Sequence, residues 1–293
     1  METPSFSIKL INIFVGLFTK NKNRFLKIYS EKIDRLGYEL VEIEPVFNSV
    51  SGKVNPEAIA HSPQRKQSLQ VEWTEKSEPP ASKISQIQRY SKVKPAEIKY
   101  AVDTLPNGVS TWLIAADHCE RDYFNAIAKF PPSTDSKLML CSFGTNSEGS
   151  AIQKTKGNFC DLELSNVIGG GILIKRIPYD YVKLDLNNLR SPKIVELTIR
   201  QLVNFHASQK HEFTSEEVAA EAFGAWEFLS EVKKRSLKRR VLRILNKFSD
   251  SVSNSHMERV LDEPPTWVLG SGLTLFLKET KKYLQEFSES TDT

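Results

Sequence analysis

The sequence predicts an α/β domain with helices packed on a sheet, followed by a mainly helical domain. Through the first part of the chain, short strand-like runs alternate with segments of helical spacing, which is the pattern of an α/β fold. From Ser191 onward most apolar residues recur at helical spacing. At 293 residues the chain is also longer than one typical domain. We therefore expect domains at residues 1–188 and 189–287, and a disordered tail at residues 288–293.

Composition sets outer bounds on the function. A hydrophobic content of 40% excludes an intrinsically disordered protein, and the net charge of +4 permits binding to a phosphate backbone without requiring it. The three cysteines, Cys119, Cys141 and Cys160, are widely spaced and cannot supply a four-cysteine iron–sulfur cluster. A reducing cytoplasm is the expected compartment.

Near the N-terminus, residues 8–18 form an apolar run. It is too short to cross a bilayer, which takes about 20 apolar residues, and no small-residue cleavage site follows it. We expect a buried first helix and no membrane partner.

Hydrophobic periodicity and turn residues predict the remaining elements of the first domain. In chain order they are a helix at residues 23–36, strands at 38–47, 57–61 and 68–74, a helix around 86–90, strands at 97–102 and 109–115, a helix at 117–130 and a strand at 137–143. Residues 144–157 are rich in Gly, Ser, Thr and Asn and predict a loop. The glycines at 169–171 predict a hairpin turn between strands at 162–168 and 172–177, and residues 180–186 a further strand.

Two acids lie on the paired strand-like runs at 57–61 and 68–74. Glu57 opens the first run and Glu72 lies near the end of the second, so pairing of the two strands would bring the carboxylates together. The alternation of Leu69, Val71 and Trp73 with polar residues places Glu72 on a polar face. That placement suits an ordinary solvated acid as well as a metal ligand.

Three short motifs carry a resemblance to a known family. Pro56-Glu57 is followed by Glu72-Trp73-Thr74, and the next helix carries Gln86 and Tyr90, four residues apart on one helix face. This arrangement resembles the PD-(D/E)XK nuclease superfamily, in particular its RecB-type branch, over residues 1–105. Two positions depart from the family pattern: Glu57 stands where aspartate is usual, and Thr74 stands where lysine is expected.

The resemblance implies a restriction-endonuclease-like mixed sheet flanked by helices, with its core at residues 20–143. It implies a magnesium ion held by Glu57 and Glu72, since magnesium keeps several waters and takes one or two carboxylates. The site that it implies has catalytic residues Glu57, Glu72, Lys76, Gln86 and Tyr90. Either Lys76 or Lys83, on the following helix, would replace the missing lysine, and Glu31 is a candidate additional acid.

The second domain begins with Ser191-Pro192, a favourable helix start, and contains a capping box at residues 214–217. We expect helices at residues 215–223 and 225–248, a small hairpin at 259–269, and a last helix at 273–287. Three helices and a hairpin resemble a winged helix.

The helix expected at 225–248 is strongly basic. Its cations are Lys233, Lys234, Arg235, Lys238, Arg239, Arg240 and Arg243. In a winged helix they would lie against DNA and neutralise phosphates. The alternative is the solvated face of an amphipathic helix.

These observations predict a DNA-binding protein with a nuclease-like domain that is a metal-dependent phosphodiester hydrolase. A second hypothesis is a catalytically inactive nuclease-fold subunit that joins other protein subunits in a DNA-processing complex for defence, repair or transposition. A third is a winged-helix transcription regulator.

Overall fold

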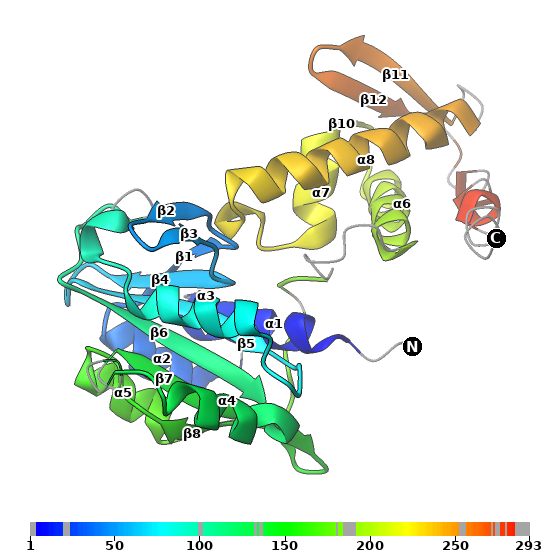
Figure 1. Ribbon diagram of the computed structural model, residues 1–293. Helices are drawn as coiled ribbons and strands as arrows, with labels where there is room; N and C mark the ends of the chain where they lie inside the picture. The colour runs from blue at the N-terminus through cyan, green and yellow to red at the C-terminus, as the bar shows by residue number, and fades with distance from the viewer. Residues whose placement is uncertain are drawn as a thin grey trace. The chain divides into compact units, whose positions relative to one another are not determined.

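The computed structural model divides the chain into two compact units (Figure 1). Unit 1 comprises Met1–Tyr181 with Phe228–Ser230, and unit 2 comprises Val182–Glu227 with Glu231–Thr293. The residues that the structure describes are 4–19, 24–98, 102–131, 134, 137–179, 181–183, 192–251, 256–270, 272, 276–278 and 280–284. The boundary expected at residue 188 lies outside them.

Unit 1 is built on one seven-stranded mixed sheet, with strand order β1-β4-β5-β6-β7-β8-β9. Its strands are β1 (Glu39–Ile43), β4 (Ala58–Ser62), β5 (Gln67–Thr74), β6 (Gly108–Ala116), β7 (Leu138–Asn146), β8 (Gly149–Lys156) and β9 (Ile172–Ile174). Strands β5, β6 and β7 run parallel to one another, and all the remaining neighbouring pairs in the sheet are antiparallel. A small separate hairpin, β2 (Phe47–Ser49) with β3 (Gly52–Val54), lies between β1 and β4 in the chain.

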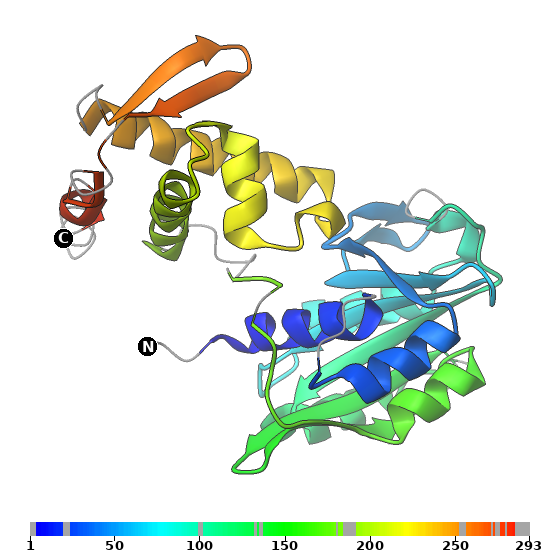
Figure 2. The ribbon, with the colours of Figure 1, turned by 180° about the vertical axis from the view of Figure 1, so that it is seen from behind.

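Helices cover both faces of this sheet (Figures 1 and 2). One face carries α1 (Phe6–Phe18), α2 (Lys27–Arg35) and α5 (Leu162–Gly169), and the other carries α3 (Ala81–Ser91) and α4 (Glu120–Ile127). On the first face Phe14 of α1 meets Trp112 of β6, with ring centroids 6.3 Å apart. On the second, Ile87 and Tyr123 pack with Leu113 in a buried cluster. The expected α/β domain with helices packed on a sheet is therefore confirmed.

The strand expected at residues 38–47 is shorter than the pattern indicated. β1 ends at Ile43 because Glu44 adopts a left-handed backbone conformation, with φ of 52°, which an extended strand cannot continue. Phe47 instead begins the separate hairpin.

Residues 144–157, expected as a loop, form most of a hairpin instead. The end of β7 pairs with β8, and Ser150 and Ile152 are buried at alternate positions of β8. The Asn146 side chain makes the turn, because its Oδ1 accepts the backbone N–H groups of Glu148 and Gly149 at 2.9 and 3.2 Å. Polar composition here marks a strand near the sheet edge, where one side of the chain faces water.

Residues 162–168, expected as a strand, form helix α5. Asp161 caps it, because Oδ1 accepts the backbone N–H groups of Glu163 and Leu164 at 3.0 and 3.2 Å. The glycine run ends this helix, and Gly171 has the positive φ of 85° that such an end favours. The expected hairpin turn is therefore wrong, and only the short β9 follows.

Two further expected strands are not present in the described residues. In the segment 97–102, Glu97 is the last residue of a 3-10 turn (Pro95–Glu97) and Ile98 lies in a bend. Residues 99–101 are not among the described residues. Within 180–186, residues 181–183 are irregular and the others are outside it. A second 3-10 turn, Asp117–Cys119, precedes α4, so the helix expected at 117–130 is shorter.

Among its described residues, unit 2 contains three continuous helices, further helical residues at 276–278 and 280–284, and a three-stranded sheet of order β10-β12-β11. Its named elements in chain order are α6 (Pro192–Ala207), β10 (Glu212–Thr214), α7 (Ser215–Phe223), α8 (Glu231–Ser251), β11 (Met257–Asp262) and β12 (Pro265–Leu269), and a 3-10 turn (Trp226–Phe228) between α7 and α8 crosses the boundary between the two units. The expected hairpin is confirmed as β11 and β12. Helix α8 starts later than residue 225, because Ala225 has a left-handed φ of 48° and the 3-10 turn follows it.

The capping box expected at the start of α7 is confirmed. Thr214 Oγ1 accepts the backbone N–H of Glu217, and the Glu217 carboxylate accepts the backbone N–H of Thr214 at 2.8 Å. In the last expected helix, residues 276–278 and 280–284 are helical, and its remaining residues and the tail lie outside the description. Among the described residues, no helix has the length and apolar content needed to cross a membrane.

Candidate functional site

The two predicted acids lie on neighbouring segments of the sheet, Glu57 just before β4 and Glu72 near the end of β5. The backbone N–H of Glu57 donates to the carbonyl of Val71 at 2.9 Å, immediately before Ala58 pairs with Val71 in the β4–β5 register. Glu57 itself lies in a bend directly before β4. Burial raises the pKa of Tyr90, and the carboxylates of Glu72 and Glu57 raise it further, so both acids lie near the Tyr90 hydroxyl. Glu57 is half-buried, whereas Glu72 is only 1% exposed.

The polar side of β5 is a buried surface. Ser68, Gln70, Glu72 and Thr74 alternate with apolar residues as the sequence indicated, and all four are buried. Helix α3 covers them: Gln70 Nε2 donates to the backbone carbonyl of Tyr90, in the last turn of α3, at 2.7 Å. The interpretation of Glu72 as an ordinary solvated acid is therefore wrong.

Lys83, in the first turn of α3, forms an ion pair with Glu72 through Nζ and Oε1. Its side chain is 20% exposed, so the cation extends from the surface toward the buried carboxylate. Lys76 is exposed and forms no ion pair within the described part of the chain. Of the two lysines that the sequence left open, Lys83 is the one in contact with Glu72.

The second oxygen of Glu72 has no hydrogen-bond donor among the described residues. The nearby Tyr90 hydroxyl has a single hydrogen, which it donates to the backbone carbonyl of Asn55 at 2.6 Å. Burial raises the pKa of the Glu72 carboxyl, and the positive charge of Lys83 acts in the opposite direction. Oε2 is therefore a buried acceptor that a cation or a water molecule would satisfy.

Gln86 and Tyr90 support the segment that carries Glu57. Gln86 Nε2 donates to the Tyr90 hydroxyl at 2.5 Å, and that hydroxyl in turn bonds to Asn55, two residues before Glu57. Burial raises the pKa of Tyr90, and the carboxylate of Glu72 raises it further. The phenol therefore stays protonated and holds this link at neutral pH.

Thr74 occupies the position where the family pattern expects lysine. Its hydroxyl lies 2.9 Å from the hydroxyl of Tyr123, on α4, and both side chains are buried. A lysine at position 74 would meet the Tyr123 ring. The neighbouring helix therefore fills this space, and the cation reaches Glu72 from α3.

Glu31, the candidate additional acid, is not part of this site. It lies on α2, on the other face of the sheet, and its side chain is 53% exposed in an ion pair with Lys27.

The pair Glu57 and Glu72 provides hard oxygen ligands of the kind that magnesium takes. In the described residues no group of three or more His, Cys, Asp or Glu side chains is arranged to hold a metal ion. Magnesium needs only one or two carboxylates when waters complete its shell, and the unsatisfied Oε2 of Glu72 fits such a ligand.

In unit 2, the seven predicted cations of α8 differ in their partners. Lys234 pairs with Glu231 at 3.1 Å and Lys238 with Glu216 at 2.8 Å, and Lys233 also has an interaction partner. The four arginines form no ion pair with any described residue. They line a surface hollow together with two small side chains; its lining is Val232, Arg235, Ser236, Arg239, Arg240 and Arg243.

Three of these arginines form a row along the helix. Arg235, Arg239 and Arg243 are exposed and four residues apart, so they lie on one face of α8. Lys247 continues the row and is also exposed, although the sequence analysis did not include it. Its spacing of four residues from Arg243 was the signal that could have identified it.

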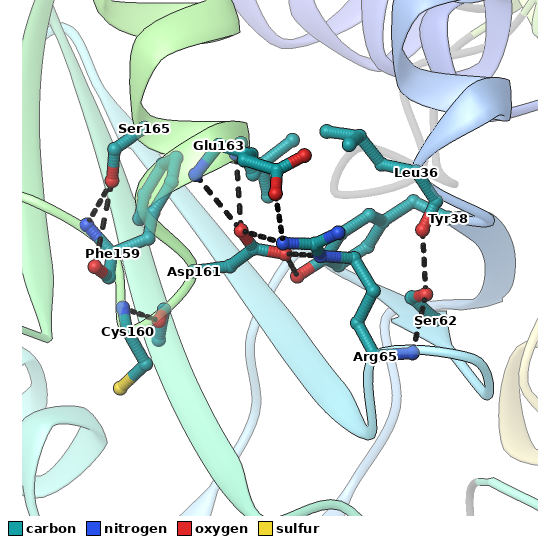
Figure 3. Close-up of polar contacts among 11 residues, drawn as sticks. Leu36, Tyr38, Ser62, Arg65, Phe159, Cys160, Asp161, Glu163 and Ser165 are labelled. Carbon is teal, nitrogen blue, oxygen red and sulfur yellow. Dashed lines mark hydrogen bonds and ion pairs between the residues drawn. The ribbon is translucent and has the colours of Figure 1, made fainter.

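A further polar cluster was not expected from the sequence (Figure 3). Arg65, in the turn between β4 and β5, binds both oxygens of the buried Asp161 and also reaches Glu163 at 3.1 Å. The Tyr38 hydroxyl donates to Asp161 at 3.1 Å, and Asp161 caps α5 as described above. Every group of this cluster is engaged, so we interpret it as a structural clamp between β1, the β4–β5 turn and α5.

Comparisons of this chain with protein-family models, with curated proteins and with solved structures find no match.

Proposed function

We propose that this protein is a magnesium-dependent phosphodiester hydrolase that acts on DNA, with an N-terminal unit of the PD-(D/E)XK nuclease type. The observation that carries the proposal is that the carboxylates of Glu57 and Glu72 both lie near the Tyr90 hydroxyl, with the Lys83 cation against Glu72. Two carboxylates and a lysine at the junction of a hairpin and a helix are the groups that this chemistry uses.

The order of elements supports the nuclease-type fold. Apart from the separate hairpin β2–β3, a helix, three strands, a helix and a fourth strand occur in unit 1 as α2, β1, β4, β5, α3 and β6. The three strands pair antiparallel in this order, and β6 lies parallel to β5 after the α3 crossover. The order of helix, three strands, helix and strand is the one that the resemblance implies, and it supports the proposal.

Each residue of the site has a distinct role in the proposal. A magnesium ion held by Glu57 and Glu72 would polarise the phosphoryl oxygen and lower the pKa of an attacking water. Lys83 provides a positive charge beside Glu72 and orients that carboxylate through its Oε1. Gln86 and Tyr90 fix the backbone that precedes Glu57, so that both acids stay in place.

We further propose that unit 2 is a winged-helix domain that holds the DNA. Its order of helix, strand, two helices and two strands, with β10-β12-β11 pairing, supports that fold. Helix α8 would then be the element that faces DNA, and its free arginines favour an anionic partner.

A second candidate function is a nuclease-type fold that binds DNA without cutting it, as a subunit of a DNA-processing complex. Thr74 and Tyr123 favour it, because their hydrogen bond fills the usual lysine position. The ion pair between Lys83 and the fully buried Glu72 is also a stable arrangement without any metal.

The test is cleavage of linear and supercoiled DNA with magnesium or manganese, using the wild type and Glu72→Gln. We expect the wild type to cut and Glu72→Gln to be inactive, with DNA binding unchanged. Glu78→Gln is the matched control, because Glu78 is an exposed acid in the loop after β5. Lys83→Met should also abolish cutting, whereas Lys76→Met should not.

Firm DNA binding by the wild type, without cutting in either metal, would contradict the hydrolase and favour the second candidate. Cutting that survives Glu72→Gln would place the reaction elsewhere in the chain.

A further inference from the structure

We propose that the exposed row Arg235, Arg239 and Arg243, rather than the lysines of α8, binds the phosphate backbone of duplex DNA independently of base sequence. We call these three residues the arginine row. The inference rests on the proposed function, because it takes DNA as the ligand of unit 2, and it specifies which residues bind and in what manner.

The cations of α8 differ in how available their charges are to a ligand. Lys234 and Lys238 form ion pairs with Glu231 and Glu216, and Lys233 also has an interaction partner, so a ligand would compete with partners inside the protein for these lysines. No described acid pairs with the arginine row, and its three residues line the hollow on α8. Guanidinium groups also match phosphate better than ammonium groups do, because they donate two parallel hydrogen bonds.

The spacing of the arginine row suits the phosphates of a DNA strand. A step of four residues advances about 6 Å along a helix, so the row extends about 12 Å and Lys247 lengthens it to about 18 Å. One strand of duplex DNA has a phosphate about every 3.4 Å along its axis, so this length faces several successive phosphates. The row is therefore long enough for contacts with several phosphates at once.

The surroundings of the arginine row favour duplex DNA over other anionic ligands. Proteins that bind single strands stack bases on exposed aromatic rings, and the only aromatic residue of α8, Phe248, is fully buried. Insertion into a membrane needs an exposed apolar helix face, but the apolar side of α8, at Leu237, Val241 and Leu245, is inside unit 2. Backbone contacts to duplex DNA remain as the best fit to a row of free cations.

The experiment compares two triple variants that remove equal charge from the same helix. These are Arg235→Gln/Arg239→Gln/Arg243→Gln and Lys233→Gln/Lys234→Gln/Lys238→Gln, in the full chain and with circular dichroism as a check of folding. Binding to labelled duplexes of unrelated sequence is measured by fluorescence anisotropy at several salt concentrations in EDTA. EDTA removes divalent metal, so that hydrolysis does not enter the measurement.

Each phosphate contact contributes about 0.9 to the slope of log K against log salt. We expect the arginine variant to lose about 2.7 from this slope and the lysine variant to lose less than about 1. We also expect the wild type to bind all the duplexes with equal affinity. Equal losses in the two variants would overturn the assignment. A strong preference for one sequence or for single strands would overturn the binding mode, and tighter binding of polyglutamate than of DNA would instead identify an acidic protein partner.

The two proposals fail separately. Glu72→Gln should retain the full salt slope, so a wild type that binds through the arginine row but never cuts would contradict the hydrolase alone. A wild type that cuts but binds equally well without the row would contradict this inference alone.

Discussion

Lys83, on the first turn of α3, lies against Glu72 of β5 and forms an ion pair with its buried carboxylate. The contact has two consequences, because it closes the helix over the sheet and also places a cation beside the candidate metal ligand. Stability and proposed activity therefore depend on the same pair of residues.

The first prediction concerns removal of this cation. Lys83→Met leaves the Glu72 charge buried without its partner, and loss of one member of a buried ion pair costs about 3 kcal/mol or more. We expect this loss in the free energy of unfolding at pH 7, measured by urea denaturation. The double variant Lys83→Met/Glu72→Gln removes both charges and should recover most of the stability.

The pH dependence of Lys83→Met follows from the direction of the Glu72 pKa shift. Burial raises this pKa in the folded protein, so the native state keeps a proton that the unfolded chain has lost. The contribution of this retained proton to the free energy of unfolding is present below the ordinary carboxyl pKa of about 4.3. It is lost as the pH rises above that value. Without the Lys83 charge the pKa rises further, so the decline should extend to higher pH.

The double variant is the control for this titration, because it has no carboxyl at position 72. Parallel pH profiles of Lys83→Met and the double variant would show that Glu72 is not the titrating group.

The second prediction concerns the clamp in Figure 3. Asp161→Ala removes the cap of α5 and leaves Arg65 and Tyr38 without their shared acceptor. Loss of a helix cap costs about 1 kcal/mol and a broken buried ion pair adds more, so we expect a total of about 3 kcal/mol in urea denaturation.

Glu163→Ala provides a matched control on the same guanidinium. Its side chain is 65% exposed, and surface ion pairs contribute less than about 1 kcal/mol. Similar losses for the two variants would mean that burial of Asp161 does not determine the strength of the clamp.

The comparison of sequence with structure shows which patterns carry information. The alternation in β5 predicted the faces of Gln70, Glu72 and Thr74 correctly, since a period of two fixes which side chains share a face. It could not show that α3 buries this polar face, because that depends on packing against a later helix. The identity of the lysine at Glu72 depends on the same packing.

Other features could not be read from local sequence at all. Arg65 and Asp161 are 96 residues apart in the chain, and no pattern links them. The run Leu162–Gly169 is apolar enough to be predicted as a strand. The cap that favours a helix there is the single residue Asp161, which is a weak signal in the sequence. In α8 the sequence predicted the cations, but only the positions of Glu216 and Glu231 separate the engaged lysines from the free arginines.

The last prediction concerns Tyr90, which touches neither metal nor substrate in the proposal and acts by positioning Glu57. Tyr90→Phe removes the hydroxyl that links Gln86 to the Asn55 carbonyl. We expect a stability loss of about 1 kcal/mol, as for a typical hydrogen bond. In DNA cleavage we expect kcat to fall about tenfold, the usual cost of losing a group that orients a metal ligand. KM should change little, because in the proposal unit 2 holds the DNA. The control is Tyr29→Phe, because the Tyr29 hydroxyl accepts a hydrogen bond from the backbone N–H of Leu173 at 2.9 Å, on the other face of the sheet. This variant should lose similar stability and retain full activity, because the Tyr29 hydroxyl is remote from Glu57. If Tyr90→Phe and Tyr29→Phe reduce kcat equally, the link from Gln86 through Tyr90 to Asn55 has a structural role only.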